Sequence, residues 1–401
     1  MEATKYQDYM FGLIKKVIDQ IGARPACSEA ENKLGKLLVE EWKPICDRVD
    51  AEPFTCSPGA FHGSIKLAGL LYLTTVILYW FFPPMALATA ALVCSIIVLQ
   101  VFRVREFVDF LFPRKQGENV IGVIRPEGQV AKRVIVGGHL DSGPEFNLFL
   151  HLKSASFPLI ALGVLAAVIA LLASLAKTIA YFNVFSNEAA LTGLGIALVA
   201  SSPLIVPFLF FSSWKPVPGA WDNMSAVSVA AGLGKYLSEA KRTGQWFPER
   251  TEVVLMATSS EEVGARGAKR YVESHLKDLK HIPTHFLALE MIKDEKFLWV
   301  SKGEPSIGAR HDPQLTKLAQ EAAEKRNWPI VAKLTPQPFY TDAARFSLCG
   351  ISATCLYSAD PNRFDPTHHT RYDTCEHVRP ESLSVMLQLV IDMIKRIDES
   401  K

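Results

Sequence analysis

Three short stretches of this chain each place acidic or imidazole side chains at the end of an apolar run. They read VIVGGHLDSG (134–143), PVPGAWDNMSA (216–226) and EVVLMATSSEEVG (252–264), and FLALEMI (286–292) and DPTHHTRYDT (365–374) follow them. Together they supply His139, Asp141, Asp222, Glu261, Glu262, Glu290, His368 and His369. Imidazole nitrogen and carboxylate oxygen in this ratio suit zinc, and a carboxylate can bridge two zinc ions. These residues therefore fit a metal-assisted amide hydrolase.

The elements around these residues are expected to bring them to one edge of a sheet. The β-branched run 134–136 predicts a buried strand that ends near His139, where open α/β sheets place their ligand sites. Asp141 follows two residues later and can orient the imidazole of a metal-bound histidine. The run 253–257 predicts a second strand, followed by the pair Glu261 and Glu262.

In a Glu-Glu pair of this kind, one carboxylate can bind metal while the other accepts a proton from water. Each motif alone also fits a role without metal binding. A His-x-Asp motif can be purely structural, and a Glu-Glu pair can lie on a solvated helix face. The ordered set of motifs carries the metal-site interpretation.

The order of the motifs resembles the co-catalytic di-zinc aminopeptidase family. The residues that carry the resemblance are His-x-Asp, Gly-Ala-x-Asp-Asn-x-Ser-Ala, Glu-Glu and His-Thr-x-x-Asp-Thr, with IGARPACSEAENKLGKLLVEEW (21–42) and YTDAARFSLCGISA (340–353) adding to it. Bacterial leucyl aminopeptidases, glutamate carboxypeptidase II and glutaminyl cyclases are members of that family. The resemblance implies a zinc-aminopeptidase mixed sheet flanked by helices, and two Zn²⁺ ions as cofactors.

The resemblance also implies a role for each site residue. It assigns His139 and Glu290 to one zinc ion, and Glu262 with His369 to the second. It makes Asp222 the bridging ligand, Glu261 the general base and Asp141 the orienting carboxylate.

Two residues depart from the family pattern. Glu290 stands where the family usually has Asp. A glutamate still ligates zinc, but its longer side chain can shift the position of the carboxylate. The last motif has two histidines where the family has one. His369 has the matching spacing and is expected to be the ligand, whereas His368 either faces substrate or is an ordinary loop histidine.

Four long apolar runs form the second large feature of the chain, and none of them contains a charged residue. They occupy 67–82, 85–102, 154–176 and 189–211, with a short polar break between Lys177 and Glu188 in the second pair. Their length fits a bilayer, and the lack of a polar stripe argues against four buried helices of a soluble core. The Pro83-Pro84 turn leaves open that the first pair is a shallow re-entrant hairpin.

Two hairpins therefore interrupt one α/β domain. We predict a zinc peptidase domain over 1–63, 105–151 and 213–401, a transmembrane hairpin over 66–103 and a second one over 154–212. Because each hairpin returns the chain to the side that it left, the three blocks are expected to meet in one compartment. The second hairpin lies between His139 and Asp222, so the metal site is expected close to the bilayer surface, either because the hairpins only anchor the enzyme or because they deliver substrate.

Flanking charges and cysteine usage indicate the side of the membrane. Basic residues flank the runs on the enzyme side, whereas the opposite side offers only Lys177; the flanking residues are Lys66, Arg103, Arg105, Lys153 and Lys215. The excess predicts a multi-pass membrane protein with a cytosolic catalytic domain. Seven cysteines without framework spacing fit reduced thiols. A net charge of +2 and the lack of a basic-aromatic patch point to no nucleic-acid partner.

The predicted function is a membrane-embedded zinc aminopeptidase that releases N-terminal amino acids from peptides. Its partners would be a peptide substrate with a free N-terminus and the lipid bilayer. Two alternative enzymes share the scaffold: a glutaminyl-cyclase-like acyl transferase with one zinc ion, and an amidase that acts on lipid-linked amino acids. A non-catalytic receptor-like homologue is the third alternative, although such proteins lose ligands and this chain keeps a full set.

Overall fold

The computed structural model describes residues 1–182 and 187–400 and divides the chain into two compact units. The first unit contains Met1–Pro58, Arg114–Pro144 and Lys215–Lys401, and the second contains Gly59–Pro113 and Glu145–Trp214. These bounds are close to those of the predicted enzyme blocks and hairpins. The assignment of 1–63, 105–151 and 213–401 to a peptidase domain stays a prediction.

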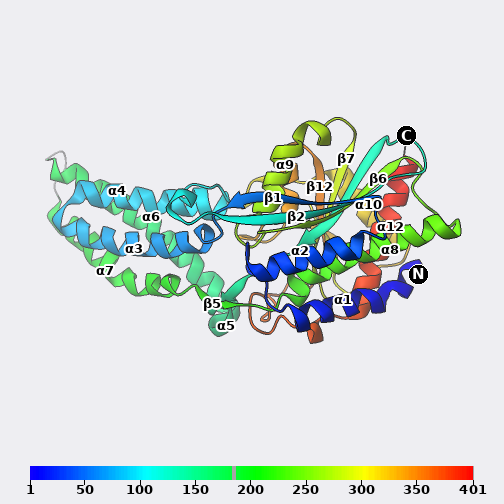
Figure 1. Ribbon diagram of the computed structural model, residues 1–401. Coiled ribbons are helices and arrows are strands. Elements are labelled where there is room, and N and C mark those ends of the chain that lie inside the picture. Colours follow the sequence, from blue (N-terminus) through cyan, green and yellow to red (C-terminus); the bar gives the residue numbers. More distant parts are fainter. Residues whose placement is uncertain (183–186, 401) are drawn as a thin grey trace. The chain divides into compact units, whose positions relative to one another are not determined.

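An eight-stranded mixed sheet forms the centre of the first unit (Figure 1). In spatial order, its strands are β1 (Arg48–Cys56), β2 (Lys115–Ile124), β6 (Thr251–Thr258), β3 (Lys132–His139), β7 (Thr284–Ile292), β12 (Ser352–Ser358), β8 (Leu298–Ser301) and β11 (Ile330–Lys333). The four central strands, β6, β3, β7 and β12, run parallel to one another. Their carboxyl ends therefore meet at one edge of the sheet, as the sequence analysis expected.

Helices cover both faces of this sheet. One face packs against α2 (Glu29–Trp42), α8 (Ser225–Thr243), α10 (Pro313–Glu324) and α12 (Pro380–Glu399), and α1 (Gln7–Gln20) packs on α8 and α12. The other face packs against α9 (Arg266–Leu279) and α11 (Asp342–Leu348). Side chains of β3 alternate between the two cores: Val134 and Val136 lie in the first, and Ile135 in the second. The predicted α/β class with a mixed central sheet is confirmed.

Two helices begin directly after a residue whose side chain caps them. Ser28 Oγ accepts a hydrogen bond from Glu31 N at 3.2 Å and starts α2, and Asp312 accepts one from Gln314 N at 2.7 Å and starts α10. The Glu31 carboxylate does not close a capping box on Ser28; it accepts hydrogen bonds from Cys27 N and Ser260 N instead. Helix α12 begins at Pro380.

The second unit is a bundle of helices. Its main members are α3 (Ala60–Phe81), α4 (Pro83–Ser95), α6 (Ser156–Tyr181) and α7 (Glu188–Leu209), and helical turns over 96–102 and 147–155 extend α4 and precede α6. Alanines of α6, including Ala166 and Ala170, pack inside the bundle, and Tyr72 Oη lies 2.6 Å from Ser201 Oγ. Small residues at such contacts allow helices to approach closely.

The outside of this bundle is also apolar. Leu70, Ile77, Leu172 and Ile196 are each more than half exposed. Four helices are long and apolar enough to cross a membrane: Ala60–Phe81, Pro83–Phe102, Asn147–Tyr181 and Glu188–Leu209. They correspond to the four predicted runs and are candidates for membrane spans. The polar break between Lys177 and Glu188 includes residues 183–186, which lie outside the described part of the chain.

Candidate metal centre

Three neighbouring parallel strands deliver the first part of the site. His139 is the last residue of β3 and pairs in register with Thr258, the last residue of β6. Glu261 and Glu262 follow β6 within a short turn, and Glu290 lies in β7 on the other side of β3. The predicted strands therefore end where the sequence placed them, and they bring these four side chains to one edge of the sheet.

Loops deliver the second part of the site. Asp222 lies in the turn that precedes α8, and its peptide bond to Asn223 is cis. His368 and His369 lie in the long segment between β12 and α12. The DPTHHTRYDT and GAWDN motifs, far apart in sequence, thus meet the strand residues in space.

The two oxygens of the Asp222 carboxylate face two different groups of residues. Oδ1 lies 3.3 Å from His139 Nε2, which itself lies 3.5 Å from Glu290 Oε1. Oδ2 lies 3.8 Å from His369 Nε2, which lies 3.5 Å from Glu262 Oε2. Asp222 is thus shared by two neighbouring sets of potential ligands.

Burial and charge make this cluster suitable for cations. Its residues are at most 8% exposed, and carboxylates outnumber imidazoles. Among the described residues, Glu261 Oε1 and Glu262 Oε1 are buried without a hydrogen-bond partner. Two groups of three side chains have ligand atoms within 4.8 Å of one another, and Asp222 belongs to both: Asp222 with His368 and His369, and Asp222 with His139 and Glu262. Nitrogen and carboxylate donors of this kind fit zinc.

The same electrostatics shift the proton equilibria of the cluster. Burial raises the pKa of Glu290 to about 8, although the His139 charge acts in the opposite direction. Burial also raises the pKa values of Glu261 and Glu262 well above the usual range, with neighbouring carboxylates adding to the effect. Burial works to lower the pKa of His139, but Glu290 and the Asp141 and Asp222 hydrogen bonds raise it well above its ordinary value. A cation would offset this crowding of negative charge.

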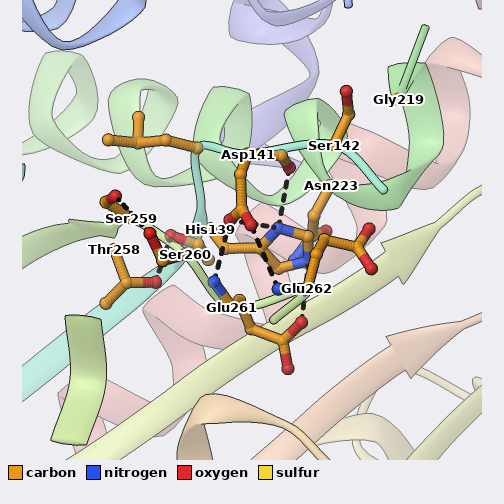
Figure 2. Close-up of polar contacts among 12 residues, drawn as sticks. His139, Asp141, Ser142, Gly219, Asn223, Thr258, Ser259, Ser260, Glu261 and Glu262 are labelled. Atoms are coloured by element: carbon orange, nitrogen blue, oxygen red, sulfur yellow. Dashed lines mark hydrogen bonds and ion pairs between the residues drawn. The ribbon is translucent and has the colours of Figure 1, made fainter. Parts of the chain in front are cut away.

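Asp141 contacts both the His139 imidazole and the Glu261–Glu262 turn (Figure 2). Its carboxylate accepts hydrogen bonds from Glu261 N at 2.9 Å and from Glu262 N at 3.1 Å. His139 Nδ1 lies 2.9 Å from the main-chain oxygen of Asp141 and 3.5 Å from its carboxylate. The predicted contact between Asp141 and the imidazole is therefore made mainly through the main chain, and the carboxylate positions the Glu-Glu turn.

Two further charged residues, which the sequence analysis did not assign, hold the loops of the site. Arg24 is fully buried and donates to Leu140 O at 2.9 Å and to Gly219 O at 2.8 Å. It therefore ties the turn after His139 to the turn before Asp222. Asp373 accepts hydrogen bonds from Trp221 N at 2.8 Å and Asp222 N at 3.3 Å, and so fixes the backbone of the shared carboxylate.

Gly143 allows the two parts of the site to approach each other. A Cβ atom at this position would collide with the imidazole of His369 and would lie 3.0 Å from Glu262 Oε1. The glycine that ends the VIVGGHLDSG motif is therefore required by close packing against two potential ligands.

His368 lies beside the shared carboxylate rather than away from it. Its Nε2 atom is 3.0 Å from Asp222 Oδ2, and its ring lies 5.4 Å from that of Trp221. Lys293 is placed over the same Trp221 ring at 4.6 Å and donates to Thr367 Oγ1 at 3.1 Å. His368 is thus packed against the site, where it contacts one carboxylate, whereas His369 contacts two.

The segment 340–353 places a further carboxylate behind the cluster. Asp342, at the start of α11, accepts a hydrogen bond from Thr258 Oγ1 and is 3% exposed. Burial raises its pKa to about 6. This segment therefore contacts the site at the end of β6.

Part of the chain matches the model of a known family. Residues 208–394, which contain Asp222, Glu261, Glu262, Glu290 and His369, match the family model of peptidase family M28. No curated protein sequence matches the chain significantly.

Solved structures of several enzymes share the fold. BSAP, a zinc aminopeptidase from Bacillus subtilis, superposes with a TM-score of 0.58 at 15% identity, covering 98% of this chain and 96% of that chain. Glutaminyl cyclase from Bacteroides thetaiotaomicron gives 0.58 at 14% identity, with 98% of each chain covered. LapB from Legionella pneumophila gives 0.57 at 13% identity, covering 100% of this chain and 74% of that one. At these identities the likeness establishes the fold, and it agrees with the relatives named from the motifs.

Proposed function

The chain is related to peptidase family M28 by its motifs, family match and fold, and from that premise we propose that it is a zinc aminopeptidase. It would release N-terminal amino acids from peptides. The observation that carries this proposal is the Asp222 carboxylate, whose two oxygens each face a separate set of imidazole and carboxylate ligands. A carboxylate placed in this way can bridge two metal ions that lie close together, as they do in two-metal hydrolases.

The residues divide into two ligand sets around Asp222. His139 and Glu290 would hold one zinc ion, and Glu262 with His369 would hold the other, with Asp222 between them. When bound, two zinc ions would hold the N-terminal amine and the scissile carbonyl of a peptide and would lower the pKa of a water molecule.

Glu261 is proposed as the group that moves the proton. Its Oε2 atom lies 3.9 Å from His139 Nε2, and its Oε1 atom has no hydrogen-bond partner among the described residues. Asp141 accepts a hydrogen bond from Glu261 N and thereby fixes the backbone of Glu261. The Glu261 carboxylate is thus held at the cluster by its backbone, and its Oε1 atom is left available to accept a proton. Glu261 would take a proton from the attacking water and later deliver it to the leaving amine.

We also propose that the bundle of apolar helices spans a membrane. Side chains such as Ile77, which is 61% exposed, and Leu172, which is 59% exposed, would face water in a soluble protein, whereas lipid would cover them in a bilayer. The flanking residues Lys66, Arg103, Arg105, Lys153 and Lys215 favour a cytosolic catalytic unit.

Labelling of engineered cysteines tests this topology. In intact cells, a membrane-impermeant maleimide should label Glu188→Cys but not Glu2→Cys, and both should react after the membrane is permeabilised. The reverse pattern in intact cells would overturn the cytosolic assignment.

A glutaminyl-cyclase-like activity is the second candidate, because the fold likeness to that enzyme equals the likeness to the aminopeptidase. It would require one zinc ion, whereas the shared position of Asp222 favours two. An amidase for lipid-linked amino acids would share the hydrolytic chemistry and differ in substrate.

Activity assays with the detergent-purified full chain separate these candidates. The panel contains aminoacyl amides, an N-terminal glutaminyl peptide and an N-acylated amino acid, with Glu261→Gln as the matched control. The proposal predicts release of the amino acid from aminoacyl amides and a turnover roughly 10²–10⁴-fold lower in the control. Cyclisation of the glutaminyl peptide or cleavage of the acylated substrate alone would contradict it.

A further inference from the structure

Two buried thiols lie against each other outside the metal cluster. Cys27 Sγ is 3.5 Å from Cys56 Sγ, and the two residues are 9% and 3% exposed. Cys27 directly precedes the N-cap of α2, and Cys56 is the last residue of β1. Residues 29 positions apart in the chain thus bring their sulfur atoms together at the end of the sheet.

The thiol pair is connected to the turn that carries the proposed base. Ser260 Oγ lies 3.3 Å from Cys27 Sγ and 3.8 Å from Cys56 Sγ. The Glu31 carboxylate accepts hydrogen bonds from both Cys27 N, at 2.7 Å, and Ser260 N, at 3.1 Å. A displacement of Cys27 is therefore transmitted to Ser260 through its side chain and its backbone, and Ser260 directly precedes Glu261.

We propose that Cys27 and Cys56 form a redox couple, whose oxidation to a disulfide lowers the hydrolytic activity of the neighbouring site. The sulfur atoms must approach by roughly 1.5 Å to reach the bond length of about 2.05 Å. The effect on activity rests on the proposed function, whereas formation of the disulfide does not.

A peroxide is the oxidant for this step. The Cys56 thiolate attacks one peroxide oxygen, the O–O bond breaks and hydroxide leaves, so that Cys56 becomes a sulfenic acid. The Cys27 sulfur then attacks the Cys56 sulfur, the S–O bond breaks and water leaves. Two thiols and one hydrogen peroxide thereby give one disulfide and two waters. The hydrogen bond from Cys27 lowers the pKa of the Cys56 thiol, which favours Cys56 as the first nucleophile.

The expected loss of activity follows from the position of Ser260. The disulfide draws Cys27 towards Cys56, so the contacts of both sulfurs with Ser260 change. Since a displacement of about 1 Å near the reacting groups can cost up to ~10²-fold in rate, we expect oxidation to lower turnover roughly tenfold or more.

Peptide mapping of the full chain tests the couple itself. The zinc-loaded protein is treated with hydrogen peroxide, remaining thiols are alkylated, and tryptic peptides are identified by mass spectrometry. We expect the peptide containing Cys27 to be joined to the peptide containing Cys56, and dithiothreitol to separate them. The same treatment of Cys46→Ser, a matched control outside the pair, should give the same cross-link. Absence of this cross-link in the folded wild type would overturn the proposal.

Turnover measured on the same samples tests the control of activity. Oxidation should slow the wild type and Cys46→Ser, and dithiothreitol should restore them with unchanged zinc content. Cys27→Ser and Cys56→Ser keep a polar group near Ser260 and should be insensitive to peroxide. Undiminished turnover of the cross-linked enzyme would refute the regulatory role. If the reduced protein hydrolyses no aminoacyl amide, the proposed function is wrong. Peptide mapping then still shows whether Cys27 and Cys56 form a disulfide.

Discussion

The two halves of the metal cluster are built in different ways. His139 and Glu290 lie on adjacent strands, β3 and β7, whose hydrogen-bonded register fixes their spacing. Glu262 follows β6 in a tight turn, and His369 lies in a long loop with a left-handed backbone (φ 51°). Asp222 is shared by both halves. The first half therefore rests on the sheet, whereas the second depends on local supports.

The supports of the second half are polar contacts between distant segments. Lys293 at the end of β7 binds Asp365 and Thr367 in the histidine loop, and Asp373 in the same loop holds the backbone of Asp222. Paired strands therefore position His139 and Glu290, whereas Glu262 and His369 depend on a network of buried hydrogen bonds.

The largest effect is expected from the residue that belongs to neither ligand set. Replacing Glu261 by Gln removes the proton acceptor but keeps the shape and the main-chain contact with Asp141. Turnover should fall by roughly 10²–10⁴-fold with both zinc ions retained. Steady-state kinetics and metal analysis of the purified variant check this, and near-normal turnover in a zinc-replete sample would refute the role of Glu261.

Removing one imidazole ligand from each half tests whether the two halves bind zinc separately. His139→Ala and His369→Ala should each lose one zinc ion per chain, because each imidazole contacts a different oxygen of Asp222. The remaining ion should bind more tightly in His369→Ala, whose strand-borne set is intact. Zinc titration against a chelator of known affinity gives both stoichiometry and affinity. Equal weakening of both ions in both variants would contradict two separable halves.

A smaller effect is expected from the residue that positions the Glu-Glu turn. Asp141→Asn retains one acceptor oxygen where the carboxylate offers two, so the hydrogen bond to Glu261 N or Glu262 N is lost. Outer partners of metal ligands typically contribute about 10–100-fold to metal affinity or activity. Zinc affinity and kcat should fall within that range. A variant indistinguishable from the wild type in both would show that Asp141 does not position the turn.

The smallest effect is expected at His368. This imidazole contacts Asp222 alone, whereas His369 contacts Asp222 and Glu262. His368→Ala should therefore keep both zinc ions and change only kcat or KM. If His368→Ala loses a zinc ion and His369→Ala does not, the assignment of the ligand is wrong by one residue.

Much of the strand-borne half could be predicted from local sequence. The apolar runs before His139 and Glu261 have the length and β-branched content of buried strands, and the structure confirms these strands as β3 and β6. Their parallel pairing brings the following polar residues together without further information. Ser28 and Asp312 are residue types that favour helix N-caps, and α2 and α10 begin directly after them.

The supports could not be predicted in the same way. Arg24 donates to main-chain oxygens more than 100 positions away. Every residue has a main-chain oxygen, so the residue type at the acceptor position does not indicate this contact. Ser28 and Glu31 have the spacing of a capping box, but the Glu31 carboxylate accepts hydrogen bonds from Cys27 N and Ser260 N, because the turn after β6 lies beside the start of α2. Long-range contacts of this kind are decided by the packing of the whole unit.

Metal analysis of Asp222→Ala tests whether the Asp222 carboxylate is a ligand of both zinc ions. If the Asp222 carboxylate serves both ligand sets, the wild type binds two zinc ions per chain, Glu290→Ala binds one, and Asp222→Ala binds neither at the same free zinc concentration. Circular dichroism of each variant shows that the fold is retained. Two zinc ions retained by a folded Asp222→Ala protein, or one in the wild type, would contradict the account.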